Sequence, residues 1–282
     1  MNLTHAHRRL MYAMRGNRYR VAQHVLSAAA AVVLWWAAAR LFHLPAFLLP
    51  TPGEVARRGW QALQEGILWR HTWVTLQEVL AGLALGTLTA TVLGYGLAKS
   101  RALERLLAPY LVASQSVPVV AIAPLLIIWF GTGLLAKTLI CALIVFFPVL
   151  VNTVVGVRSV PEELHDLFRS LHASRWQTVR YLEIPAALPV FLGGLRIGAT
   201  LSVIGAVVGE FVAADSGLGF LINLARGRYD TALVFVAVFV LVGLALTLYG
   251  SVVALERRFL AWQAPSARSG AAQSSPGGEF TP

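Results

Sequence analysis

Long runs of apolar residues, separated by short polar segments, dominate the sequence. A helix needs about 20 mostly apolar residues to cross a bilayer, and about six segments meet that requirement. The pattern therefore predicts an all-α, polytopic membrane protein. The predicted spans are residues 21–41, 79–98, 106–130, 137–155, 190–213 and 231–255.

The third and fourth spans follow each other almost without interruption. As one helix, residues 106–155 would be about 75 Å long at 1.5 Å per residue, far more than a bilayer accommodates. The chain must therefore turn back once, and the two glycines of Gly131-Thr132-Gly133 permit the backbone reversal. We expect Lys137, just after this turn, to extend its amine to the membrane interface.

Composition supports the membrane assignment, because 57% of the residues are hydrophobic, only 13% are charged and the mean hydropathy is +0.68. The net charge of +10 does not indicate nucleic-acid binding, because the arginines are spread between apolar runs and do not share one polar face. The single cysteine, Cys141, can form no internal disulfide and is expected to be a small core residue.

The basic N-terminus followed by an apolar run has the charge order of a signal peptide, but the run is longer than usual and further spans follow. We therefore expect an uncleaved first span after a cytoplasmic segment, residues 1–20. With the N-terminus in the cytoplasm, 15 basic residues lie inside and 7 outside, with Arg196 within a span. This excess predicts that both termini are cytoplasmic.

Three further features complete the predicted organisation. Thr51-Pro52-Gly53-Glu54 has the form of a capping box and predicts a short helix at the outer surface. Residues 21–262 form the transmembrane domain, with a cytoplasmic loop at 156–189. Residues 263–282, rich in Pro, Ser, Gly and Ala, are expected to be a disordered tail.

Signatures of catalysis are missing from the sequence. The segment 94–100, GYGLAKS, ends like a phosphate-binding loop, but Leu93 and Ala98 stand where that loop needs glycine. No HExxH, CxxC or GxSxG motif occurs. We therefore predict a protein that is not an enzyme and has no catalytic residues, cofactor or metal site.

Polar residues within the spans are candidates for a solute path. Ser114, Gln115 and Ser116 lie among prolines, a pattern that breaks a helix at bilayer depth, where irregular backbone must face protein or water. The alternative is ordinary hydrogen bonding between helices. Glu210 is expected to face the bundle interior, a partner chain or external water, in a structural or a path-lining role. Arg196 is better explained as a snorkelling or paired residue than as a ligand site.

The polar segment 161–189 predicts a helix-turn-helix. Ser159-Val160-Pro161-Glu162 and Ser174-Arg175-Trp176-Gln177 fit capping boxes, His172-Ala173 interrupts the pattern, and Pro185 is expected to end the second helix. One face of the first helix is apolar, which favours docking to another protein or contact with the membrane surface. This face carries Leu164, Leu167, Phe168 and Leu171.

The segment 166–174, with Trp176 and the ending Ile184-Pro185-Ala186-Ala187-Leu188-Pro189, resembles the EAA loop of ABC-importer permeases. The resemblance covers about residues 26–262, and within the family the chain is similar to the nitrate/sulfonate/taurine-type branch. It is also carried by Leu49-Pro50-Thr51-Pro52, Trp129-Phe130-Gly131, Phe146-Phe147-Pro148, Asn152-Thr153, Gly194-Leu195-Arg196-Ile197-Gly198, and Glu210 with Ser216-Gly217-Leu218-Gly219.

The resemblance implies a permease subunit of the bacterial inner membrane, paired as a homodimer. Two ATP-hydrolysing subunits would grip the cytoplasmic side, and a solute-binding protein would deliver the solute outside. Asp166 stands for the motif glutamate and His172 for its glycine; if the turn is left-handed, histidine costs about 1 kcal/mol there. The implied ATPase-coupling residues are Glu163, Leu164, Asp166, Leu167, Phe168, Leu171, His172, Ala173, Ser174 and Trp176.

Two other classes remain as alternatives. An ATP-independent secondary transporter should carry ion-coupling carboxylates at mid-membrane, and a membrane enzyme should carry a reactive constellation. The sequence shows neither, apart from Glu210 near one end of a span. The solute is expected to be small and anionic, like a sulfonate, taurine or nitrate; bicarbonate and nucleobase-like precursors also suit relatives.

Overall fold

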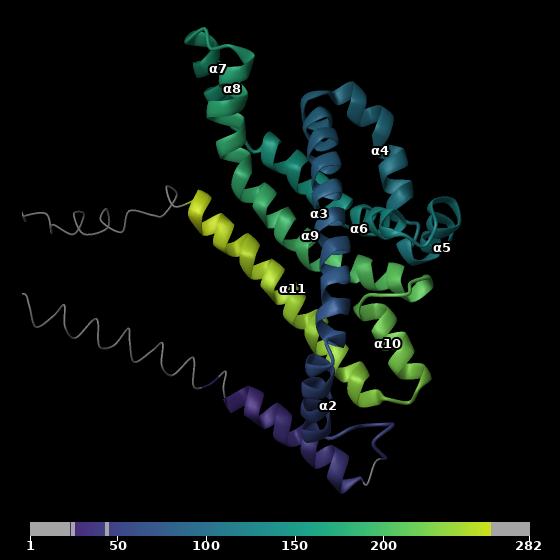
Figure 1. Ribbon diagram of the computed structural model, residues 1–282. Helices are drawn as coiled ribbons and strands as arrows, with labels where there is room; N and C mark the ends of the chain where they lie inside the picture. The colour runs from purple at the N-terminus through teal and green to yellow at the C-terminus, as the bar shows by residue number, and fades with distance from the viewer. Residues whose placement is uncertain (1–22, 24–25, 43–44, 261–282) are drawn as a thin grey trace, which may run out of the picture. The chain divides into compact units, whose positions relative to one another are not determined.

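The computed structural model describes residue 23, residues 26–42 and residues 45–260 (Figure 1). Every regular element within them is helical, which confirms the predicted all-α class. Segments 1–20 and 263–282 lie outside the described residues. After an apolar helix, Leu26–Leu41, come α2 (Pro52–Gln64), α3 (Ile67–Lys99), α4 (Arg101–Gln115), α5 (Val119–Phe130), α6 (Leu134–Arg158), α7 (Glu162–Ser170), α8 (Arg175–Thr178), the π-helical turn η1 (Val179–Glu183), α9 (Ile184–Val212), α10 (Leu218–Gly227) and α11 (Thr231–Phe259).

Four helices among the described residues are long and apolar enough to cross a membrane: α3, α6, α11 and the continuous helix Arg175–Val212. The pair α4–α5, bent by 96°, would make a fifth. The expectation of about six spans is therefore confirmed in part, because the predicted first span, 21–41, is described only in part. Helix α3 begins well before the predicted residue 79, since polar residues such as His71 and Glu78 are buried within it and do not interrupt the helix.

The predicted reversal between the third and fourth spans is confirmed. Helix α5 ends at Phe130, and Gly131 follows with a φ of +79°, a conformation that glycine adopts without strain. Helix α6 then begins at Leu134 and contacts α5. The expectation for Lys137 is wrong, because its side chain is only 3% exposed. It is enclosed by the protein and does not extend to the interface.

The chain forms two compact units. Unit 1 comprises the residues up to Glu78 together with Ala206–Gly243, and unit 2 comprises Val79–Gly205 and the residues from Leu244 onward. Helices α3, α9 and α11 each contribute residues to both units.

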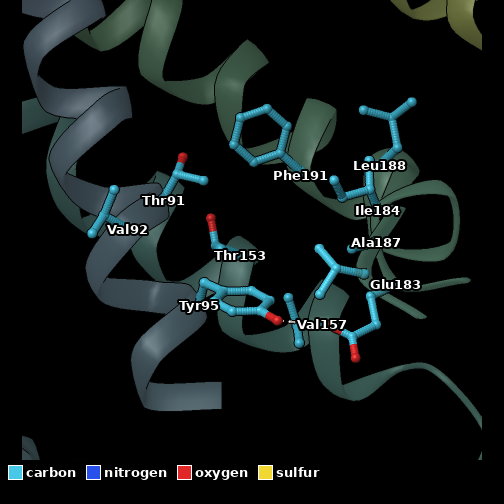
Figure 2. Close-up of a pocket in the computed structure, with 11 residues that line it drawn as sticks. Thr91, Val92, Tyr95, Thr153, Val157, Glu183, Ile184, Ala187, Leu188 and Phe191 are labelled. Carbon is cyan, nitrogen blue, oxygen red and sulfur yellow. Dashed lines mark hydrogen bonds between the residues drawn. The ribbon is translucent and has the colours of Figure 1, made fainter. Parts of the chain in front are cut away.

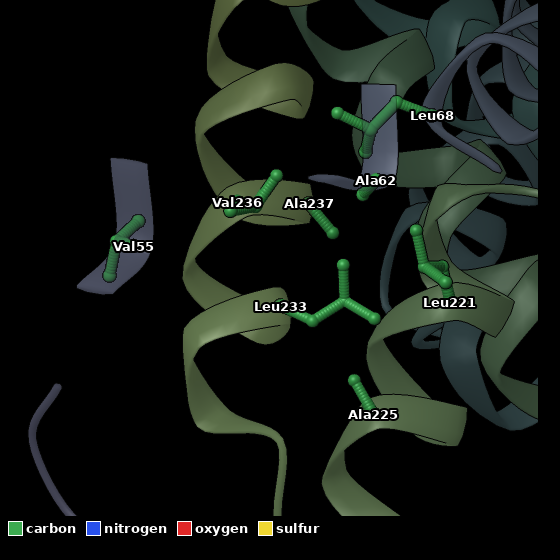
Figure 3. Close-up of a cluster of buried hydrophobic side chains, with 8 residues drawn as sticks. All are labelled: Val55, Ala62, Leu68, Leu221, Ala225, Leu233, Val236 and Ala237. Atoms are coloured by element: carbon green, nitrogen blue, oxygen red, sulfur yellow. The ribbon is translucent and has the colours of Figure 1, made fainter. Parts of the chain in front are cut away.

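Unit 1 has an apolar core formed by α2, α3, α10 and α11, in which Leu233 points toward Leu221 and Ala225 (Figure 3). The predicted capping box at the start of α2 is confirmed. The Glu54 N–H donates to the Thr51 hydroxyl at 3.3 Å, and the Thr51 N–H donates to the Glu54 carboxylate at 2.7 Å. Hydrogen bonds from the Thr51 N–H, and then from its hydroxyl, lower the pKa of Glu54 below its ordinary value.

Unit 2 depends on close approach between helices. Gly82 and Gly86 of α3 form a GxxxG pattern, and a Cβ atom at Gly82 would lie 2.1 Å from the Cβ of Cys141 in α6. A Cβ at Gly205 of α9 would lie 2.8 Å from the Cα of the same cysteine. Cys141 is fully buried, as predicted for a small core residue.

Candidate functional site

The first helix of the 156–189 loop is α7, but it does not begin with the predicted capping box. Ser159 is instead the C-cap of the preceding helix, α6, and its hydroxyl donates to the Gly156 carbonyl at 2.8 Å. Pro161 occupies the N-cap position of α7 and supplies no side-chain hydrogen bond. Because Ser159 ends one helix, it is not available to begin the next.

The turn after α7 has left-handed backbone at His172, with a φ of +53°. The His172 N–H donates to the Arg169 carbonyl at 2.9 Å, and the Ala173 N–H donates to the Phe168 carbonyl at 3.0 Å. This pair of bonds is a Schellman motif, which usually has glycine at the left-handed position. The chain therefore uses histidine where the resemblance led us to expect glycine.

The second helix of the loop begins with the predicted capping box at Ser174, whose hydroxyl accepts the Gln177 N–H. The prediction that Pro185 ends this helix is wrong. In the π-helical turn η1, the Ile184 N–H donates to the Val179 carbonyl, five residues earlier. This wider turn takes the helix past the proline, so Arg175–Val212 is continuous.

The apolar face of α7 is largely uncovered by the described residues. Leu164 is 40% exposed, Leu167 is 51% exposed and Leu171 is 67% exposed. Phe168 and Ala173 are half-buried. The exposed polar side of α7 carries Arg169, which pairs with Asp166 and Glu162. The remaining predicted coupling residues, Glu163, His172, Ser174 and Trp176, are exposed.

The loop is attached to α3 by residues that the sequence analysis did not single out. Glu183 in η1 is 3% exposed and accepts hydrogen bonds from the Lys99 amine and the Tyr95 hydroxyl. Lys99 is the last residue of α3. A carboxylate inside an otherwise apolar helix pattern, just before Ile184-Pro185, is the signal that could have identified Glu183.

An apolar cavity of about 490 Å³ lies beside this attachment (Figure 2). Thr91 and Val92 of α3 line one side, and Leu188 and Phe191 of α9 line another, with the Tyr95 hydroxyl directed toward Glu183. A second, polar cavity of about 520 Å³ shares Tyr95 and Glu183. The side chains of α3 and α9 are therefore not closely packed at this end.

The predicted path residues differ in their surroundings. The helix breaks between α4 and α5 as the prolines predicted, and Ser114, Gln115 and Ser116 are exposed at the break. Glu210, by contrast, is 1% exposed inside unit 1. Its carboxylate therefore does not line an accessible surface of the chain in this structure.

Glu210 holds the segment that begins α10. Its Oε1 accepts the Thr75 hydroxyl at 2.6 Å, and its Oε2 accepts the Gly219 N–H. His71 accepts the Gly217 N–H at 3.0 Å, and Gly217 has a φ of +114°. A Cβ there would lie 2.1 Å from Glu210 Oε1, so this close approach requires glycine.

The partners of Glu210 were not predicted from the sequence. His71, Thr75 and Glu78 are buried, lie on one face of α3 at helical spacing, and Glu78 is a neighbour of Glu210. This polar stripe, directly before an apolar run, is the sequence signal that could have identified these partners.

Arg196 is paired as expected, with Glu256, and lies over the Tyr249 ring. Among the described residues, no group of three or more His, Cys, Asp or Glu could hold a metal ion.

The described helices, the broken span and the loop agree with a known family. The family model for the binding-protein-dependent transport system inner membrane component matches residues 82–261. The chain belongs to this family. It is a permease component of an ABC importer, a multi-pass protein of the inner membrane, and is not itself catalytic. The family implies an ATPase and a binding protein as partners.

Three curated relatives are similar to the permease over most of its length. RibX, the riboflavin transport system permease protein of Chloroflexus aurantiacus, is 53% identical and covers 83% of this chain and 87% of its own. ThiX, the formylaminopyrimidine transport permease protein of Halalkalibacterium halodurans, is 35% identical, with an alignment that covers 82% of this chain and 92% of ThiX. TauC, the taurine transport system permease protein of Escherichia coli, is 32% identical, with an alignment that covers 82% of this chain and 86% of TauC.

A solved structure shows the same fold. A chain of the inward-facing MetNI methionine ABC transporter aligns with a TM-score of 0.62 at 21% sequence identity. The alignment covers 70% of the permease and 97% of that chain. The helical arrangement is therefore that of an ABC-importer permease.

Proposed function

We propose that the chain is the permease through which an ATP-driven importer moves a small heteroaromatic solute, and that α7 is its ATPase-docking helix. The observation that carries the docking proposal is the exposed apolar face of α7. Burying Leu164, Leu167 or Leu171 would contribute about 1.5–3 kcal/mol per side chain. An amphipathic helix with an uncovered apolar face suits a groove in a partner, and the family supplies an ATPase as that partner.

The continuous helix supports a mechanical role for the loop. Because α8, η1 and α9 form one helix, Arg175–Val212, a displacement of the loop would move the span as a rigid body. ATP-driven closure of the ATPase pair would thus alternate access to the solute path. Family membership decides against the ATP-independent carrier and against the membrane enzyme.

The arrangement of the complete importer is also part of the proposal. Two copies of the permease, two ATPase subunits and one solute-binding protein would assemble, with the loop and both termini in the cytoplasm. The excess of basic residues on that side supports the orientation. Exposed Ser114, Gln115 and Ser116 are proposed to line the path; for buried Glu210 we propose a structural role.

Similarity to relatives supports the choice of solute. Riboflavin and formylaminopyrimidine both contain nitrogen heteroaromatic rings, and the permeases named for them are 53% and 35% identical to this chain. An anionic sulfonate such as taurine is the second candidate, supported by TauC at 32% identity. Uptake of labelled riboflavin into proteoliposomes with the cognate ATPase and binding protein tests the choice. Taurine uptake without riboflavin uptake would reverse it.

A charge placed on the apolar face of α7 tests docking. We expect Leu167→Asp to abolish both the copurification of the ATPase and ATP-driven transport. Phe168→Asp, made as a separate variant, should have the same effect. Ser170→Asp is the matched control, because it adds the same charge to α7 outside the apolar face. Undiminished association and transport in Leu167→Asp would contradict the docking proposal.

A further inference from the structure

A buried carboxylate joins the coupling loop to the end of α3. The Lys99 amine donates to Glu183 Oε1 at 2.5 Å, and the Tyr95 hydroxyl donates to Glu183 Oε2 at 3.0 Å. The Lys99 nitrogen also lies 5.9 Å from the centroid of the Tyr95 ring. Each of the three side chains therefore interacts with the other two. Both oxygens of Glu183 are engaged, and its side chain is almost inaccessible to solvent.

The surroundings of this network make it mechanically important. The apolar cavity separates Thr91 and Val92 of α3 from Leu188 and Phe191 of α9 (Figure 2). A void removes the dispersion contacts that close packing would supply. The polar network is therefore a direct link between α3 and the helix that carries the loop, at the end where the loop is attached.

The strength of the link follows from burial. If Lys99 moved away, the Glu183 carboxylate would remain buried without its counter-charge, which is strongly unfavourable. The link is therefore expected to persist while the loop moves. Exposed ion pairs, such as Arg169 with Glu162, have no such constraint, because water replaces the partner.

We propose that Glu183 is a positioning residue for energy coupling. Through Lys99 and Tyr95 it transmits the movement of the α7–α8 loop to α3, so that α3 and α9 move together when the ATPase closes. This inference rests on the proposed docking of the ATPase to α7. It adds a second span to the movement, whereas the continuous helix by itself moves only α9.

The test uses the complete transporter in proteoliposomes and measures the solute transported per ATP hydrolysed. Glu183→Gln keeps the shape of the side chain and removes its charge, and Lys99→Met removes the counter-charge. We expect either change to lower the ratio about tenfold, equivalent to about 1.4 kcal/mol, while ATPase copurification stays unchanged. The double variant should cost no more than either single one, because both remove the same pair. Lys99→Arg should retain the ratio.

The matched control is Glu104→Gln, which breaks the exposed ion pair between Glu104 and Arg158 at 2.6 Å without touching the Glu183 network. The amount of solute that this variant transports per ATP hydrolysed should equal that of the unmodified transporter. An unchanged ratio in folded Glu183→Gln overturns the inference and leaves ATPase docking intact. Loss of copurification in Glu183→Gln also overturns it, because the residue would then support docking itself. If Glu183→Gln does not fold, Tyr95→Phe decides: a lower ratio supports the link, and an unchanged ratio overturns it.

Discussion

The Thr75 hydroxyl donates to Glu210 Oε1 at 2.6 Å and accepts the Leu218 N–H at 2.8 Å, so one side chain joins α3, α9 and the start of α10. Both Thr75 and Glu210 are buried. The segment Ser216-Gly217-Leu218-Gly219 is therefore held by polar groups with little access to water. This arrangement supports the proposed structural role of Glu210, which is to hold this segment in place.

Replacing Thr75 by valine should destabilise unit 1. The change keeps the shape of the side chain but removes one hydrogen bond from the buried Glu210 carboxylate and leaves the Leu218 N–H without its acceptor, at a cost of about 1–3 kcal/mol for each group. Thermal unfolding of the purified protein measures the loss. Thr75→Ser should restore most of it.

The control for this prediction is Thr89→Val. The Thr89 hydroxyl is exposed and bonds only to carbonyls of its own helix, so its loss should have little effect. Equal unfolding temperatures for Thr75→Val and Thr89→Val would contradict the assigned role of Thr75.

Glu210 also shows which part of the site the sequence could predict. An acidic residue in a span must be shielded from lipid, so its enclosure was among the expected outcomes. Its partners were not predicted, because hydropathy marks the limits of spans and not their tertiary contacts. His71, Thr75 and Glu78 lie in the part of α3 that was too polar to be assigned to a span.

Ser159 and Pro185 show how local rules fail when two structural solutions compete. The Ser159 segment matches a capping box, but the preceding helix uses the same serine at its end. Pro185 matches a helix stop, but a π-helical turn accommodates it. The capping boxes at Thr51 and Ser174 were predicted correctly because each follows a segment that is not helical.

Adding a methyl group at Gly82 should separate α3 from α6. The new Cβ would lie 2.1 Å from the Cys141 Cβ, and such overpacking typically costs about 1–3 kcal/mol. Gly193→Ala is the control, because a Cβ there meets nothing within 4 Å. The change at Gly82 should lower the unfolding temperature, and the change at Gly193 should not.

A second substitution tests the same contact. Cys141→Gly removes the atom that the new methyl group meets, so Gly82→Ala together with Cys141→Gly should cost less than the sum of the single changes. Strictly additive losses would show that Gly82 and Cys141 are not in close contact.

The start of α2 should weaken in acid. The Thr51 hydrogen bonds lower the pKa of Glu54 below its ordinary 4.5, so the carboxylate stabilises the cap above that pH. Stability is lost as the pH falls through the lowered value, because protonation removes the negative charge that strengthens the hydrogen bonds from Thr51. Hydrogen exchange of α2 amides between pH 6 and pH 3, after correction for intrinsic rates, measures this loss. Glu54→Gln should remove the pH dependence, and an unchanged dependence would contradict the assignment.

Glycine at position 172 should stabilise the turn between α7 and α8. His172 has a φ of +53°, and a left-handed backbone costs an L-residue about 1 kcal/mol that glycine avoids. The amide of residue 172 bonds to the Arg169 carbonyl and that of Ala173 to the Phe168 carbonyl. Both amides should exchange about fivefold more slowly in His172→Gly. His172→Val should have the opposite effect, because a β-branched residue tolerates this conformation poorly.

His165→Gly makes the same chemical change inside α7, the helix before the turn, and is the matched control. His165 lies inside α7, where glycine costs up to about 1 kcal/mol of helix stability, so the same substitution should speed exchange there. Opposite signs at positions 165 and 172 would show that the left-handed turn, and not the loss of the imidazole ring, determines the result. Faster exchange in both variants would mean that the His172 ring stabilises the turn by more than its backbone strain costs.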